Sequence, residues 1–298
     1  MTKSAGAAGG LLDESDPFPL PDDLPVSPLV GAASFDFWEP VPLGTDRAGA
    51  PVSLPLAGAN LLIAGAVASG VSRAAQHAAA AAALDPTTEL SVFDPEGMPG
   101  DWWPFARLAT RIVAGTRYRE NDGTLEALTE LQARIEERLA QGALTGSAMR
   151  ARQFAPHLVV VANAERFTRD HADGNAIADA LAAIARHGPR AGYSLLLTSH
   201  WPEYFLRDGE LGRAIEHRLV LHEPDAQRSA AILGAKVEQR LGVSAGDLRR
   251  RGTGILSNGK DGRLVHGYFL DNDMLKAIYR AAAAARGIDP VRGVDWAN

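Results

Sequence analysis

Short apolar runs alternate with helix-length segments between residue 60 and residue 221. The runs are rich in Leu, Val and Ile, which is typical of strands that are buried on both faces. Such runs, separated by helices, predict an α/β fold with a mostly parallel sheet and helices on both faces. The expected strands are residues 51–56, 60–64, 89–93, 158–162, 193–198 and 217–221, the expected helices are residues 71–84, 125–141, 175–187 and 273–286, and a C-terminal hairpin is expected over residues 254–268.

The first 34 residues have a different composition, rich in Gly, Ala, Pro and Asp. Prolines in this stretch lack a backbone donor, so they disfavour a helix or an inner strand. We therefore expect a disordered or extended arm over residues 1–34 and one large domain over residues 35–298. The hydrophobic content of 46% is sufficient for a domain of that size.

Several classes of protein are disfavoured by composition. The chain has no cysteine, which excludes disulfides, thiolate zinc sites and cysteine nucleophiles. Its formal net charge of −6 is unlike that of a protein whose whole surface binds nucleic acid. The histidines form no H-x-x-x-H pair, so no metal site is expected. No apolar run reaches the roughly 18 residues of a membrane helix, so we expect a soluble cytoplasmic protein, with recruitment to a membrane by a partner as the alternative.

The loop after the strand at residues 60–64 has the spacing of a phosphate-binding loop. That loop reads G-x-x-x-x-G-K-[ST] and joins a buried strand to a helix, so that its backbone amides and the helix N-terminus face an anion. The candidate nucleotide-binding residues, with the helix residue that follows, are Gly65, Ala66, Val67, Ala68, Ser69, Gly70, Val71, Ser72 and Arg73.

The position of the phosphate-binding lysine is occupied by Val71, which carries no charge. Arg73 lies two residues further along the helix, and successive helical residues point about 100° apart, so it is a poor replacement. No lysine lies between Lys3 and Lys236. The loop alone therefore favours a glycine-bounded turn that binds no ligand.

Further motifs in the same order resemble those of the FtsK/SpoIIIE family of ATP-driven motors. The chain has G-T-D-R-A-G-A-P-V at residues 44–52, N-L-L-I-A-G followed by the loop at residues 60–72, D-P-E-G at residues 94–97, and a strand that continues into T-S-H-W-P at residues 198–202. The resemblance covers residues 41–280 and implies a RecA-like P-loop domain. It also implies ATP and Mg²⁺ as cofactors, and FtsK-like subunits as partners in a homo- or hetero-oligomeric ring.

The resemblance also identifies where the chain departs from the family. The Asp-Glu pair that holds magnesium and orients the attacking water is replaced by Asn163 and Ala164. Glu165 is one position late, so it is either a carboxylate at a helix start or a displaced catalytic acid, and Asp94 is another acidic candidate. The glutamine expected after the next strand is His200, a sensor-like position.

These departures predict a degenerate module that binds nucleotide weakly or not at all and hydrolyses it slowly or not at all. Two alternatives remain at this stage: an active translocase of DNA or protein with unusual catalytic residues, and a module that binds a secreted peptide. Arg190 and Arg218 are candidates for the arginine that reaches into a neighbouring subunit's site. The run of arginines at residues 249–251 is either a solvated charge run or a phosphate contact.

Overall fold

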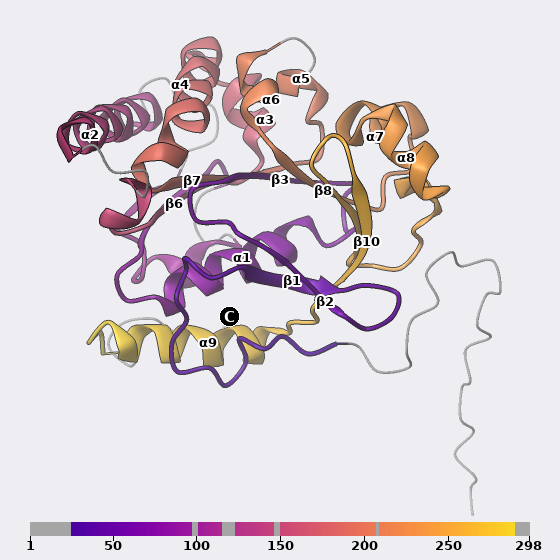
Figure 1. Cartoon of the computed structure of the whole chain (residues 1–298), viewed down its shortest axis with the longest axis horizontal. Coiled ribbons are helices and arrows are strands. Elements are labelled where there is room, and N and C mark those ends of the chain that lie inside the picture. The colour runs from indigo at the N-terminus through magenta and orange to yellow at the C-terminus, as the bar shows by residue number, and fades with distance from the viewer. Residues whose placement is uncertain (1–24, 97–100, 115–122, 146–149, 207–208, 290–298) are drawn as a thin grey trace, which may run out of the picture.

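The computed structural model describes residues 25–96, 101–114, 123–145, 150–206 and 209–289 (Figure 1). Strands in these ranges form one ten-stranded sheet in the order β2-β1-β10-β9-β8-β3-β7-β6-β4-β5. The six strands from β8 to β5 are parallel and the other pairings are antiparallel. The strands are β1 (Val41–Thr45), β2 (Pro51–Leu54), β3 (Asn60–Ala64), β4 (Glu89–Asp94), β5 (Arg111–Ala114), β6 (His157–Val161), β7 (Tyr193–Ser199), β8 (His217–Leu221), β9 (Thr253–Ser257) and β10 (Gly262–Gly267).

Helices cover both faces of this sheet, as the alternation of segments predicted. Figure 1 shows α1 and α9 on one face and the other helices on the opposite face. The helices are α1 (Val71–Leu84), α2 (Thr124–Thr145), α3 (Ala164–Thr168), α4 (Gly174–His187), α5 (Glu203–Leu206), α6 (Glu210–Ala214), α7 (Ala226–Leu233), α8 (Ala235–Leu241) and α9 (Asn272–Ala285). None of the helices in the described residues combines the length and the apolar character that crossing a bilayer requires.

Strand β3 illustrates why the central strands are apolar throughout. Leu61 and Ile63 belong to the core that α1 and α9 cover, whereas Leu62 belongs to the core on the opposite face. Successive side chains of a strand point to opposite faces, so a strand with helices on both sides buries every residue. The sheet therefore separates two apolar cores, and the predicted α/β architecture is confirmed.

Two strands were not expected from the sequence. β1 contains Pro42 and Gly44, residue types that are depleted in strands, and its pairing with β2 shifts register between them. A Cβ atom on Gly44 would lie 2.1 Å from the carbonyl oxygen of His266, so β10 approaches β1 closely only because this residue is glycine. β5 is a four-residue edge strand, too short to give a periodic signal.

The described part of the N-terminal arm packs against the domain. The Oγ atom of Ser27 lies 2.7 Å from Nε2 of His77 in α1, and the Phe269 amide donates to the Pro25 carbonyl oxygen at 2.8 Å. Leu29 and Phe37 are buried in the core that includes α1. Residues 25–34 therefore form part of the packed domain, and residues 1–24 of the expected arm lie outside the described residues.

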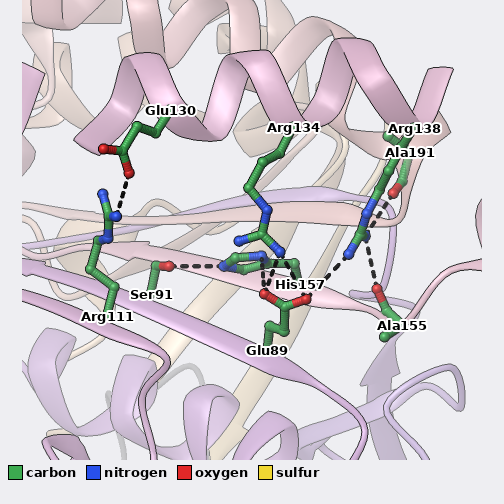
Figure 2. A network of polar contacts seen from close by, with 9 residues as sticks. All are labelled: Glu89, Ser91, Arg111, Glu130, Arg134, Arg138, Ala155, His157 and Ala191. Atoms are coloured by element: carbon green, nitrogen blue, oxygen red, sulfur yellow. Dashed lines mark hydrogen bonds and ion pairs between the residues drawn. The ribbon is translucent and has the colours of Figure 1, made fainter. Parts of the chain in front are cut away.

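A polar network ties the amino-terminal edge of the sheet to α2 (Figure 2). Arg134 donates to both carboxylate oxygens of Glu89, and Arg138 reaches the same carboxylate and the carbonyl oxygens of Ala155 and Ala191. His157 lies beneath these groups and is fully buried. This network lies at the edge opposite the carboxyl ends of the parallel strands, where ligands bind in such sheets.

Candidate functional site

The loop between β3 and α1 has a backbone that depends on its two glycines. Gly65 ends β3 at a φ of 155°, and a Cβ atom there would lie 2.8 Å from Oγ of Ser69. Gly70 precedes α1 at a φ of 111°, a conformation that residues with a side chain rarely adopt. Ala68 also has a positive φ, of 68°. The glycine spacing found in the sequence therefore corresponds to a real constraint of the fold.

Most backbone amides of this loop are available to a ligand. The Ala66 amide donates to the His222 carbonyl oxygen at 2.9 Å, and the Ser69 amide donates to Ala66. Within the described residues, no acceptor is assigned to the amides of Val67, Ala68 and Gly70 or to the first amides of α1. The helix has 14 residues, and open amides at the N-terminus of a helix are donors that commonly bind anions in proteins.

The side chain of Ser69 is a second indication that the loop accommodates a ligand. Ser69 is only 6% exposed, and its hydroxyl has no hydrogen-bond partner in the part of the chain that the structure describes. This hydroxyl lies on the inner side of the turn, against Gly65. A buried hydroxyl without a partner is costly, so a bound phosphate or water at this turn would relieve an existing penalty.

The residue at the lysine position is apolar and almost fully buried. Val71 is 2% exposed and packs in the core that α1 shares with α9. Ser72 and Arg73 are half-buried and line the pocket beside the loop, where Arg73 donates to Oδ1 of Asn272 at 2.9 Å. Position 71 therefore contributes apolar packing, and the nearest side-chain cation on α1 is bound to the start of α9.

A pocket of about 710 Å³ opens beside the loop. Its walls are the loop, the first turns of α1, and residues 266–272, which join β10 to α9. His200, Arg251, Gly252 and Asp101 complete the lining. This volume is in the range of ligand pockets in enzymes, and its position is at the carboxyl ends of the parallel strands.

The residues in place of the acidic pair lie at the end of β6, two strands from β3. Asn163 has a left-handed conformation with a φ of 47°, and its amide donates to Oγ1 of Thr198. Ala164 is fully buried and begins α3. Neither side chain lines the pocket.

Glu165 is a buried carboxylate whose two oxygens are engaged. It is 1% exposed and accepts a hydrogen bond from Oγ of Ser199 at 2.6 Å and a longer one from the His200 amide at 3.3 Å. The carboxylate therefore anchors the end of β7 to the start of α3. It does not line the pocket.

His200 connects this anchor to the loop. Its Nδ1 atom lies 2.8 Å from the carbonyl oxygen of Gly65. A carbonyl oxygen only accepts, so Nδ1 carries the proton and Nε2 is the acceptor of the neutral ring. The sensor-like position found in the sequence is thus in the pocket wall and in contact with the loop.

The three remaining candidates lie away from the pocket. Asp94 ends β4, and two strands lie between β4 and β3. Burial raises the pKa of Asp94 to about 6. Arg218 donates to the carbonyl oxygens of Ile232 and Gly212, and burial lowers its pKa. Arg190 is exposed and precedes β7, at the edge of the sheet opposite the loop.

Sequence reasoning did not foresee the segment that contacts the loop from the C-terminal hairpin. The Gly252 amide donates to the Ser69 carbonyl oxygen at 2.9 Å, and Nε of Arg251 donates to the Ala68 carbonyl oxygen at 2.8 Å. These residues follow the loop by about 180 positions, so no local pattern could place them there. The only signal was the arginine run at residues 249–251.

No family model and no curated protein matches the sequence, but solved structures do. The pCW3 conjugation coupling protein TcpA, in its monomer form with ATPγS, has a TM-score of 0.70 at 17% identity over 88% of this chain and 75% of TcpA. A structure of ATPases 2 and 3 of EssC from Geobacillus thermodenitrificans has a TM-score of 0.71 at 14% identity over 90% of this chain and 52% of that one.

The cytoplasmic domain of the type VII secretion ATPase EccC from Thermomonospora curvata has a TM-score of 0.63 at 19% identity over 82% of this chain. The chain thus spans about half of the EssC structure and 31% of the EccC structure. These identities establish a shared fold, and the same family was indicated by the sequence motifs. The fold of this chain is that of the P-loop ATPase domains of conjugation and type VII secretion proteins.

Proposed function

We propose that this chain is a nucleotide-binding module of a translocase or secretion assembly and that it hydrolyses ATP very slowly or not at all. The observation that carries the proposal is the loop at residues 65–72, whose open amides adjoin a pocket of about 710 Å³ and whose buried Ser69 hydroxyl has no partner among the described residues. These features fit a phosphorylated ligand. TcpA, which shares the fold, was solved with ATPγS.

The proposal of slow hydrolysis depends on which groups are missing near this pocket. Val71 is buried in the core, and Asn163 and Ala164 replace the acidic pair. Phosphoryl transfer relies on positioned charges, each of which is typically worth about 3 kcal/mol. The loss of three such groups is expected to lower the rate by several orders of magnitude.

Glu165 is a weak substitute for the missing acid because its oxygens already accept hydrogen bonds from Ser199 and His200. The described residues contain no group of three or more His, Asp or Glu side chains placed to hold a metal. Mg²⁺ would therefore be held mainly by the phosphates of the nucleotide and by water, with the Ser72 hydroxyl as the protein group at the family's position.

The partners follow from the resemblance and not from this chain's own surface. A module of this type would assemble with itself or with FtsK-like subunits in a ring and act there as a regulatory or structural subunit. The substrate of the assembly would be DNA or a secreted protein, and a partner would recruit the ring to a membrane.

A second candidate function is peptide binding. ATPases 2 and 3 of T. curvata EccC were solved with a signal sequence peptide, and that structure has a TM-score of 0.62 at 15% identity over 85% of this chain and 44% of that one. Tyr204 in α5 is 54% exposed and offers an apolar contact. Fluorescence anisotropy with a labelled signal sequence peptide, using Tyr204→Ser as the variant, tests this candidate.

The main proposal is tested by titrating the protein with a fluorescent ATP analogue, with and without Mg²⁺, and measuring phosphate release in the same samples. Gly65→Ala places a Cβ atom 2.8 Å from Oγ of Ser69 and is expected to abolish binding. Gly49→Ala is the matched control, because Gly49 also has a positive φ but would meet no atom within 4 Å.

Micromolar binding without phosphate release, lost in Gly65→Ala and kept in Gly49→Ala, would support the proposal. Phosphate release well above that of Gly65→Ala would contradict slow hydrolysis and favour an active ATPase with unusual catalytic residues. Absence of binding by the wild-type protein would contradict nucleotide binding itself and leave peptide binding as the candidate.

A further inference from the structure

We propose that Arg251 supplies the positive charge that the loop lacks at position 71, and that its guanidinium binds the phosphates of the nucleotide. The inference rests on the proposed nucleotide binding. Arg251 follows the loop by about 180 residues and contacts it only through the fold.

The backbone holds Arg251 in place beside the loop. The amide of the next residue, Gly252, donates to the Ser69 carbonyl oxygen at 2.9 Å, and the Gly252 carbonyl oxygen accepts from the Gly267 amide at 2.9 Å. This segment is thus hydrogen-bonded on one side to the loop and on the other to the end of β10. The Cα atom of Arg251 therefore has a fixed position relative to the loop amides.

The guanidinium is oriented and still has donors to offer. Nε of Arg251 donates to the Ala68 carbonyl oxygen at 2.8 Å. A guanidinium has five N–H groups, so the four on the two Nη atoms remain, and the structure assigns them no partner among the described residues. Arg251 is exposed and lines the pocket. A planar, permanently charged fork in this position matches the geometry of phosphate oxygens.

The other basic side chains near the loop are less suited to this role. Arg73 is bound to Asn272 at the start of α9, and His200 uses Nδ1 to hold Gly65. Arg249 and Arg250 make other contacts and do not line the pocket. Among the described residues, no carboxylate lies within ion-pair distance of Arg251, so its charge is not already neutralised.

Two substitutions at Arg251 separate the charge from the hydrogen bond to Ala68. Arg251→Lys keeps the positive charge but loses the guanidinium fork and the Nε contact. Arg251→Gln removes the charge. The matched control is Arg263→Gln, which removes an exposed arginine from β10 outside the pocket. The dissociation constant for ATP is measured by calorimetry at two salt concentrations, and urea unfolding confirms that each variant is folded.

We expect Arg251→Gln to weaken ATP binding about 10-fold to 100-fold, the range for a hydrogen bond to a charged group. Arg251→Lys should bind more tightly than Arg251→Gln, and Arg263→Gln should equal wild type. The loss of ATP affinity in Arg251→Gln should be smaller at high salt, because salt screens the charge of Arg251 in the wild-type protein.

Equal losses of ATP affinity in Arg251→Lys and Arg251→Gln would mean that Arg251 only stabilises the conformation of the loop. Unchanged ATP affinity in both variants would mean that Arg251 has no role in binding. Either result overturns this inference and leaves the proposed function intact. A folded wild-type protein that binds no ATP overturns both.

Discussion

The Nδ1 atom of His200 lies 2.8 Å from the carbonyl oxygen of Gly65. The two residues follow neighbouring parallel strands, β7 and β3, and the amide of His200 is in turn held by Glu165. A buried carboxylate at the start of α3 is therefore connected, through the backbone amide and the imidazole of His200, to the first glycine of the loop. The conformation of the loop depends on residues that the local sequence does not contain.

Replacing His200 with alanine should weaken nucleotide binding without unfolding the protein. The change leaves the Gly65 carbonyl oxygen without its donor, which typically costs about 1 kcal/mol, or roughly fivefold in affinity if it loosens the loop. Titration with the fluorescent ATP analogue measures the effect. His187→Ala removes an exposed histidine at the end of α4 and serves as the control. Wild-type affinity in His200→Ala would show that the contact is not needed for binding.

Introducing acidic residues at positions 163 and 164 should have very different costs in stability. Asn163 is half-buried in a left-handed conformation that Asp also tolerates, and a negative charge is favourable at the N-terminus of α3. Asn163→Asp should therefore change the free energy of unfolding by less than about 0.5 kcal/mol. Ala164 is fully buried beside Glu165, so Ala164→Glu buries a second carboxylate and should destabilise the fold by about 3 kcal/mol or more.

Urea unfolding of the two single variants tests this contrast. Equal stabilities would show that the site can still accommodate the acidic pair. The expected result would show instead that packing around Ala164 excludes a glutamate at this position.

Asp94 should make the protein less stable as pH rises. Burial raises its pKa from 3.8 to about 6, so between these values the folded state holds a proton that the unfolded state has lost. The free energy of unfolding therefore falls as pH rises through this window, by up to about 3 kcal/mol at about 1.4 kcal/mol per pH unit. Asp94→Asn keeps an acceptor for the Glu96 amide and removes the titration.

The difference in stability between Asp94→Asn and wild type should thus grow from pH 4 to pH 8, as measured by urea unfolding. Buried His77 and His157 have pKa values lowered to about 4 and about 3, so they act in the opposite direction in both proteins and cancel in the difference. A constant difference would mean that Asp94 titrates normally in the fold.

Glu89 should contribute more to stability than the other glutamate of the network in Figure 2. Its carboxylate accepts hydrogen bonds from Arg134 and Arg138, so Glu89→Gln should cost about 1–3 kcal/mol. Among the described residues, Glu130 pairs only with the partly exposed Arg111, and Glu130→Gln should cost less than about 1 kcal/mol. Urea unfolding at low and high salt compares the two variants. A larger loss of stability in Glu130→Gln than in Glu89→Gln would contradict the prediction that Glu89 contributes more.

Several elements could be predicted because their signal is local. Strand β3 and helix α1 were found from the run of apolar residues, the two glycines and the alanine-rich segment that follows. β1 was not predicted because it contains Pro42 and Gly44, residue types that are rare in strands. Gly44 is needed there only because β10 approaches β1 closely. The role of Glu165 could not be read from the sequence, since its partners Ser199 and His200 follow it by more than 30 residues.

The sequence by itself determined the order of the central strands and of the long helices α1, α2, α4 and α9, the loop at residues 65–72 and the absence of a charge at position 71, because these depend on residue types at short spacing. Only the tertiary structure decided which distant groups surround that loop. Residues 251, 252 and 266–272 reach it because β9 and β10 extend the sheet next to β8, which lies beside β3. Long-range strand pairing sets these contacts, and a pattern within a short window cannot encode it.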